Sequence, residues 1–506
     1  MNNDNITLNH HGKQSLFDPT RWGLPKTAID DLANRLQRIW ERYRNCFLTK
    51  TRDTSEYALI YMRGLLTMDT KRNYANIARR VIGINDDGQD IQQFMSDSPW
   101  SAKKVFSQIQ SEIKSYTELN NGMLTLDESG DKRSGSQSAG TARQHIGRLG
   151  KVDMGQVGVA LGYYQSCLDR MNGIWAMVDA QLYLPKEWFD KAHEKLRQRW
   201  HIPKERRFAF KAGLGLDMIR QAKAYGLQFE IVGCDTAYGR DSKFRTALHA
   251  EDILYMADIP NNIYVYPTKP VFGVPPTSTS GKQGRPRSRK QVVNGVKPVK
   301  VCFFANDAES ASFLTPVPIR YSERGMLEYE CSVFRVWTVS QGVVREECLL
   351  VRKETDGDFS FSLSNALDAS LEQLAYWRCE RYFAERIFQD VKTEGGWDEL
   401  VARKYRAWEH HTALDAIALW FAGETKLNWS HQYPRDSMLL EELGVSQLPA
   451  LSMSNVREML KAVLPLPQLS PEEAIQLVIK HLVNRSHSTR CRLKAQRRMS
   501  HQSREP

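Results

Sequence analysis

The spacing of apolar residues predicts that the first part of the chain is helical. From residue 27 to residue 117, apolar side chains recur every three or four positions, as at Leu32 and Leu36, which is the repeat of a helix that buries one face. Two such segments, residues 73–80 and 91–95, are separated by a polar break. They have the layout of a helix-turn-helix that reads DNA, and equally that of an ordinary helical pair. Both interpretations stay open.

The pattern then changes to short strands and helices in alternation. Apolar runs end at Asp127 and at Asp235, which predicts a buried strand that stops at each aspartate. Strands are also expected at residues 157–164, 174–184 and 253–256, and helices at residues 214–225 and 242–249. This order predicts one mixed sheet flanked by helices, with both aspartates where strands run out into loops.

From residue 261 to residue 362 the helical repeat disappears. Short β-rich runs replace it at residues 263–266, 299–304, 329–339 and 347–352, which predicts a β-rich insertion. Every charge between residues 275 and 306 is positive. Within that stretch, Arg285 and Arg287 flank a proline, similar to the core of a hook that inserts arginine into a narrow minor groove. A flexible cationic linker is the alternative.

A helix after the insertion carries a third acidic residue. Phe383, Ile387 and Val391 recur every fourth position and therefore mark its buried stripe. Glu385 lies on a different face, which it shares with Arg381 and Lys392. The two cations suit phosphate binding beside a scissile bond; alternatively, Arg381 pairs with the glutamate four residues on and Lys392 is a solvated charge.

The three separated acids suit a site for divalent ions. Two-metal cleavage of a phosphodiester needs hard oxygen ligands around ions about 4 Å apart. The carboxylates of Asp127, Asp235 and Glu385 fit Mg²⁺ or Mn²⁺, whereas clustered cysteine or histidine would indicate zinc. Any one of these acids alone is better explained as a helix cap or a solvated charge; their combination favours metal ligands. His410 and His411 point in different directions on one helix, so packing is predicted for them.

Two strand-end aspartates followed by a helical glutamate resemble the catalytic core of the DDE transposases of insertion sequences. The spacing from Arg381 to Glu385 to Lys392 matches the Arg-x3-Glu-x6-Lys part of their signature, although its tyrosine slot holds Arg378. Four further stretches look like the insertion-sequence family numbered seven hundred and one, and the resemblance covers most of the chain. They are residues 147–151, 182–188, 235–239 and 408–411.

The resemblance implies a fold and additional DNA contacts. It implies that Lys151 lies near the bound DNA. The likeness to hairpin-forming transposases further implies that Trp337 is a platform on which a DNA base stacks. The alternative for Trp337 is packing within a β-layer. The implied fold is multidomain α/β, an RNase H-like mixed sheet with flanking helices, interrupted by the β-rich insertion and preceded by an all-α domain. The expected boundaries are 1–26 for a flexible N-terminus, 27–117 for the helical DNA-binding domain, 118–260 and 363–426 for the two parts of the catalytic core, 261–362 for the insertion with its basic loop, and 427–506 for a C-terminal helical region and basic tail.

The composition is consistent with a polyanionic binding partner and indicates in which cell compartment the protein is expected. The 506 residues carry a formal net charge of +11, and beyond His481 the cations are opposed only by Glu505, which suits DNA. The eight cysteines show no paired spacing, so neither a zinc site nor a disulfide framework is predicted. Without a signal-like start or a long apolar run, we expect a soluble cytoplasmic protein associated with a nucleoid, of bacterial type.

These observations predict a DDE transposase that binds the terminal inverted repeats of its own element, cleaves DNA at the element ends and joins them to target DNA. The expected cofactor is Mg²⁺, two ions per active site with Mn²⁺ as a substitute, and the expected partner is double-stranded DNA, on which the protein forms a homodimer. A noncatalytic DNA-binding protein derived from a transposase is one alternative, disfavoured because all three acids are present. A metal-dependent nuclease without strand transfer is the other.

Overall fold

The computed structural model describes seven segments of the chain and a few single residues toward the C-terminus. The segments are residues 26–166, 173–275, 289–306, 313–322, 325–400, 402–432 and 452–464. The predicted flexible N-terminus, both arginines of the basic loop, Arg285 and Arg287, and most of the basic tail therefore lie outside the described residues.

The described chain begins with helices, as the apolar spacing predicts. The pair expected at residues 73–80 and 91–95 corresponds to α4 (Tyr74–Val81) and α5 (Gln89–Ser96), and Asn73 caps the first of them by accepting from the Asn76 amide. Both helices bury their apolar faces, and a role in reading DNA stays a prediction. The other helices of this region are α1 (Lys26–Asp30), α2 (Leu32–Tyr43), α3 (Ser55–Thr67) and α6 (Ala102–Ser115).

A mixed sheet forms the centre of the molecule. Strand β1 pairs antiparallel with β3 and parallel with β5, and β5 pairs parallel with β6. On the other side, β3 pairs antiparallel with β2 and β4. These strands are β1 (Gly122–Lys132), β2 (Ala142–Ile146), β3 (Lys151–Gln165), β4 (Ile174–Leu182), β5 (Phe229–Cys234) and β6 (Tyr255–Ile259). The prediction of a mixed α/β fold with one large sheet is confirmed.

The β-rich insertion continues this sheet. Strand β14 (Phe359–Ser364) pairs antiparallel with β6, and β13 (Val343–Lys353), β12 (Gly325–Ser340) and β11 (Thr315–Ser322) follow in order toward the edge, completing a sheet of ten strands. The short strands are β7 (Tyr264–Val265), β8 (Phe272–Gly273), β9 (Gln291–Val292) and β10 (Val299–Lys300).

Two sequence predictions need correction. Strand β1 does not stop at Asp127 but continues to Lys132, because β3 is long enough to pair with it beyond the end of β5. The run at residues 299–304 is not one strand, since β10 ends at Lys300 and the short helix α11 (Phe303–Asn306) begins after a two-residue turn.

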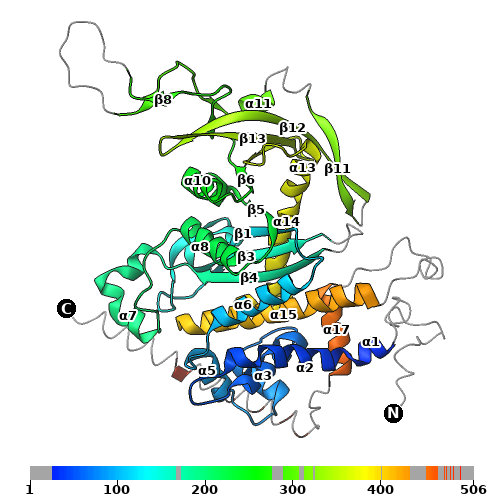
Figure 1. The fold of residues 1–506 in the computed structure, drawn as a ribbon. Helices are drawn as coiled ribbons and strands as arrows, with labels where there is room; N and C mark the ends of the chain where they lie inside the picture. The colour runs from blue at the N-terminus through cyan, green and yellow to red at the C-terminus, as the bar shows by residue number, and fades with distance from the viewer. Residues whose placement is uncertain are drawn as a thin grey trace, which may run out of the picture.

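Helices cover both faces of the central strands. Helix α8 (Lys211–Ala224) packs on β3 and β4, with α10 (Ser242–Ala250) beside it, while α14 (Tyr382–Asp390) crosses β1, β3 and β4. The long helix α15 (Tyr405–Gln432) lies between β4 and the N-terminal helices α3 and α5 (Figure 1). The N-terminal helices therefore share one hydrophobic cluster with the central sheet.

The remaining described helices are short or peripheral. They are α7 (Glu194–Arg199), α9 (Thr236–Gly239), α13 (Leu371–Glu380) and α17 (Met453–Val463). Within the described segments, no helix has the length and apolarity needed to cross a bilayer. The domain boundaries stay a prediction.

Candidate active site

The pairing register places Asp127 and Asp235 next to each other. The last parallel pair between β1 and β5 joins Leu126 to Cys234, so each aspartate follows that pair by one residue. Alternate residues of a strand point to the same face, and Thr125 lies close to Ile387 of α14 across Gly162. The Asp127 side chain therefore lies on the face that α14 covers.

Asp235 lies where the sequence predicts, at the end of a strand. Strand β5 stops at Cys234, and the Asp235 carboxylate caps α9 by accepting from the Ala237 amide at 2.9 Å and from the Tyr238 amide at 3.4 Å. The neighbouring acid Glu128 belongs to a different contact, because its carboxylate accepts from the Lys211 ammonium of α8 at 2.7 Å.

Burial makes the two aspartates harder to ionise. Burial, with the negative charge of Asp235 as the next cause, raises the pKa of Asp127 to about 7. Burial also raises the pKa of Asp235, against the hydrogen bond from the Ala237 amide and the positive charge of Arg381. A cation beside such carboxylates favours their charged form.

Glu385 approaches Arg381 from α14. The predicted buried stripe of this helix is confirmed, since Phe383, Ile387 and Val391 are all buried. Glu385 lies off that stripe with its side chain 60% exposed, and its carboxylate is 3.9 Å from the Arg381 guanidinium.

Arg381 is the common neighbour of the three acids. Burial lowers its pKa, but the negative charges of Asp258, Asp127, Glu385 and Asp235 outweigh burial and raise the pKa above its ordinary value. The structure thus brings the three predicted acids together around one guanidinium.

Asp258, which the sequence reasoning missed, holds that guanidinium. This buried residue of β6 lies 2.8 Å from the Arg381 Nε and 2.6 Å from the Arg378 Nε, and it accepts from the Ser362 hydroxyl at 2.7 Å. The sequence does contain a signal for this residue, namely an aspartate inside the apolar run of a central strand. An acidic side chain is rarely buried there unless a basic group pairs with it. Arg378 in the signature's tyrosine slot therefore acts as a second partner of Asp258.

A glycine brings α14 close to the sheet. A Cβ atom at Gly162 of β3 would lie 2.4 Å from the Ile387 Cδ1 and 2.6 Å from the Thr125 Oγ1, well inside van der Waals contact. The missing side chain leaves room for Ile387, which sets the distance between the glutamate helix and the strand that carries Asp127.

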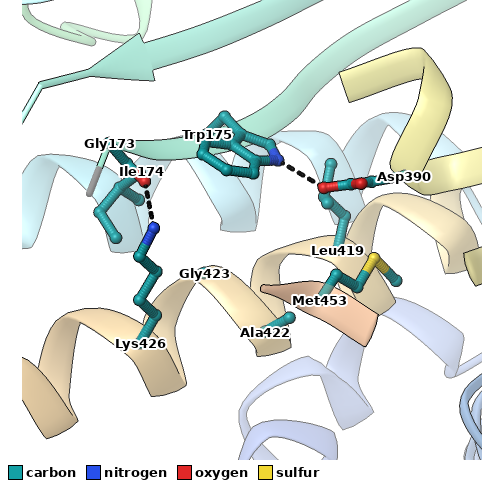
Figure 2. A pocket seen from close by; sticks show the side chains of 9 residues that line it. All are labelled: Gly173, Ile174, Trp175, Asp390, Leu419, Ala422, Gly423, Lys426 and Met453. Carbon is teal, nitrogen blue, oxygen red and sulfur yellow. Dashed lines mark hydrogen bonds between the residues drawn. The ribbon is translucent and has the colours of Figure 1, made fainter. Parts of the chain in front are cut away.

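The far end of α14 is fixed by polar contacts. The Trp175 indole of β4 donates to the Asp390 carboxylate at 2.9 Å, and the Lys426 ammonium of α15 donates to the Gly173 carbonyl at 2.8 Å (Figure 2). The same ammonium lies 4.9 Å from the centre of the Trp175 ring. The glutamate helix is thereby tied to both the sheet and α15.

The oxygen atoms of the three carboxylates are suitable ligands for a divalent ion. Among the described residues, no three His, Cys, Asp or Glu side chains already converge closely enough to hold a metal. The donor set nevertheless fits, because carboxylate oxygens are the ligands that Mg²⁺ and Mn²⁺ prefer, and a cation would favour the charged form of Asp127 and Asp235, whose pKa values burial raises.

The other predicted DNA contacts are spread over the molecule. Lys392 lies past the end of α14, in a π-helical turn, with its ammonium 3.9 Å from the Asp131 carboxylate. Lys151 begins β3 at an exposed hairpin tip, 3.9 Å from the Asp153 carboxylate. Trp337 is half-buried in β12, where its backbone exchanges two hydrogen bonds with Tyr266. DNA binding by these residues stays a prediction.

The histidines behave as predicted. His410 and His411 are both buried. The His410 ring stacks on Trp100 with 3.6 Å between ring centres, and the His411 Nδ1 lies 2.9 Å from the Tyr61 hydroxyl. Packing, rather than metal binding, explains this pair.

The chain is similar to DNA-cleaving and transposing proteins over much of its length. The family described as DDE superfamily endonuclease matches residues 42–312, more than half of the chain, including Asp127 and Asp235. A curated relative, "Probable transposase for insertion sequence element IS701" from Microchaete diplosiphon, is 28% identical over 198 residues, 39% of this chain and 47% of that protein. The match thus spans about half the length of the relative. Both findings confirm the resemblance predicted from the sequence.

Among solved structures, the cryo-EM structure of the piggyBac transposase synaptic complex with hairpin DNA aligns with 92% of this chain and 85% of its own. The sequence identity is 11% and the TM-score is 0.35, a likeness too distant to carry an argument about the site.

Proposed function

Because the chain belongs to the family of DDE superfamily endonucleases, we propose that it is the transposase of an insertion sequence. It binds the terminal inverted repeats of its element, cleaves DNA at the element ends and joins them to target DNA. The observation that carries the proposal is the β1–β5 register, which sets Asp127 and Asp235 side by side with Arg381 close to both and to Glu385. The strand order β4, β3, β1, β5, β6 supports an RNase H-like core.

We propose that Asp127, Asp235 and Glu385 hold two Mg²⁺ ions, with Mn²⁺ as a substitute. When bound, the ions supply the charge that activates the attacking oxygen and stabilises the leaving oxygen. Burial is the first cause of the raised pKa values of these half-buried aspartates, and it supports this assignment because a divalent cation beside them favours their charged form.

The residues of the chain itself prepare the site for DNA. Asp258 holds Arg381, so its guanidinium stays beside the three acids instead of turning to solvent. Once cations balance those acids, the Arg381 charge is available to a backbone phosphate next to the bond that is cut. The proton that Asp127 carries near neutral pH must leave when a cation binds.

The experiment compares two aspartates in matched surroundings. Asp241 caps α10 by accepting from the Lys243 and Phe244 amides at 2.9 and 3.4 Å, as Asp235 caps α9. Asparagine retains a cap. Asp235→Asn should therefore abolish Mg²⁺-dependent cleavage of element-end DNA while Asp241→Asn retains it, and both should bind that DNA in a gel-shift assay. Cleavage by Asp235→Asn near the wild-type rate would refute the assignment.

A second assay separates a transposase from a nuclease. Element ends that have already been cut are incubated with the protein, Mg²⁺ and a supercoiled plasmid. Insertion of the ends into the plasmid supports strand transfer, whereas cleavage without insertion supports a nuclease. Because two ends must be joined in one event, the proposed active species is a homodimer on DNA, and light scattering of the protein with end DNA tests it.

A further inference from the structure

A cavity adjoins the candidate active site. It has a volume of about 300 Å³ and lies between strands β11–β13 of the insertion and helices α13 and α14. Arg381 and Glu385 line it on the side of the three acids, so it is contiguous with the site described above. Tyr382 and Glu385 are exposed, and solvent therefore reaches it.

The lining of this cavity is strongly basic. Arg320, Arg352, Arg378 and Arg381 contribute four guanidinium groups, whereas Glu385 is the one acidic residue of the lining. Three separate parts of the chain supply these arginines, namely β11, β13 and α13 with the joint that follows it. Like charges gathered in this way repel one another unless acidic groups or a bound anion balance them.

Acids behind the lining balance only part of that charge. Asp258 pairs with Arg378 and Arg381, and Glu354 pairs with Arg352 at 2.6 Å. Arg320 lies against rings, with its guanidinium carbon 4.8 Å from the centre of Phe383 and 5.8 Å from that of Tyr382. Its acidic neighbour is Glu380, whose pKa burial raises to about 7 against a hydrogen bond from Tyr164 and the positive charge of Arg320. The Arg320 Nε is buried and has no hydrogen-bond partner within the described part of the chain.

Aromatic rings complete the lining. Tyr329 lies under the Arg352 guanidinium at 4.3 Å, and Tyr382 lies at the exposed side. A volume of about 300 Å³ is at the small end of the range for small-molecule sites, enough for a phosphate with part of its sugar. Guanidinium groups recognise phosphate through paired hydrogen bonds, and rings beside them accept a sugar or a base.

We propose that this cavity binds a phosphate group of the DNA strand, next to the phosphate that is cut, with Arg320 and Arg352 of the insertion as its principal ligands. The inference rests on the proposed function and deepens it, because it gives the β-rich insertion a direct contact with the substrate. Either an internal phosphodiester or a terminal phosphate presents this chemistry.

The test measures DNA binding by the full chain without metal. A fluorescent DNA duplex of arbitrary sequence is titrated in EDTA at several salt concentrations. Removing one bound phosphate lowers the slope of log affinity against log salt by roughly 0.9, so Arg320→Gln and Arg352→Gln should each lower it by about that amount. Lys353→Gln is the matched control, because Lys353 follows Arg352 directly but is exposed and pairs with Glu330.

The variants and probes separate the possible outcomes. Arg320→Lys keeps the charge and should restore most of the slope. If removal of the terminal phosphate from the duplex abolishes the difference between wild type and Arg320→Gln, the ligand is the terminal phosphate; if the difference persists, the ligand is an internal phosphodiester. Slopes of Arg320→Gln and Arg352→Gln equal to wild type in proteins with unchanged thermal unfolding would overturn the inference.

This test is independent of catalysis. A chain that never cuts DNA would still report the phosphate contact, so a negative result in the cleavage assay and a negative result here count against different proposals.

Discussion

At the scale of single residues, Asp258 is the feature on which the position of Arg381 depends. Its buried carboxylate lies within ion-pair distance of two arginines and accepts a hydrogen bond from a serine hydroxyl. Asp258→Asn keeps the shape but removes the charge that holds both arginines. We regard Asp258 as a positioning residue, since it touches Arg381 and not the three acids.

We predict that Asp258→Asn lowers the cleavage rate roughly tenfold to a hundredfold, the range for residues that orient a site through another residue. Breaking a buried ion pair also destabilises the fold by about 3–5 kcal/mol, which chemical denaturation measures. Asp258→Glu should recover part of the rate. An effect on stability alone, with cleavage per folded molecule unchanged, would make Asp258 a purely structural residue.

Asp127 gives the site a characteristic pH dependence. Its pKa in the fold is about 7, above that of an unfolded aspartate, so the folded state holds a proton that the unfolded state releases between about pH 4 and pH 7. Its contribution to stability is therefore fully present below about pH 4 and lost as the pH rises through 7.

It follows that Asp127→Asn should raise the free energy of unfolding of the metal-free protein more at pH 8 than at pH 4. The difference between the two pH values should be at most ~4 kcal/mol, since one pKa unit corresponds to ~1.4 kcal/mol. Denaturant unfolding of both proteins at the two pH values measures this difference. Mg²⁺ affinity of the wild type should fall below pH 7, because protons compete for the same carboxylate. A stability difference that does not change with pH would contradict the cause given for the shift.

At the scale of elements, the distance between α14 and the sheet is set by Gly162. We predict that Gly162→Ala costs about 1–3 kcal/mol, as overpacking of a core does, and lowers cleavage more than DNA binding because α14 carries Glu385. Ile387→Val removes the atom that the new Cβ would meet and should offset part of the loss in the double variant. Additive effects of the two substitutions would show that the contact is not the cause.

Elements whose residues are close together in the chain could be predicted from the sequence, and those that depend on distant partners could not. Strand β5 and the stripe of Phe383, Ile387 and Val391 follow from local periodicity. The end of β1 does not, because its length depends on pairing with β3. Asp258 was missed for the same reason, since the arginines that explain it are more than a hundred residues away. Each of the three proposed acids has a local context that the sequence shows, whereas their shared proximity to Arg381 is visible only in the fold.

At the scale of the whole molecule, DNA affinity is expected to come from charges spread over several parts of the chain. Deleting the residues after Asn484 removes six arginines and one lysine. We predict a weaker salt dependence of DNA binding, with the slope reduced by roughly 0.9 for each phosphate that the tail no longer binds. Fluorescence titration against salt measures it. A tail that serves only solubility would leave the slope unchanged.

The packing of α15 on β4 also bears on how the protein is made. Synthesis delivers both aspartates long before Glu385, and α15, whose Lys426 donates to the Gly173 carbonyl ahead of β4 (Figure 2), arrives later still. A chain that stops before α15 would lack the helix that lies between β4 and the N-terminal helices α3 and α5. Because α15 shares one hydrophobic cluster with the sheet and those helices, such a truncated product would have an open core and would not hold the aspartates as the longer chain does.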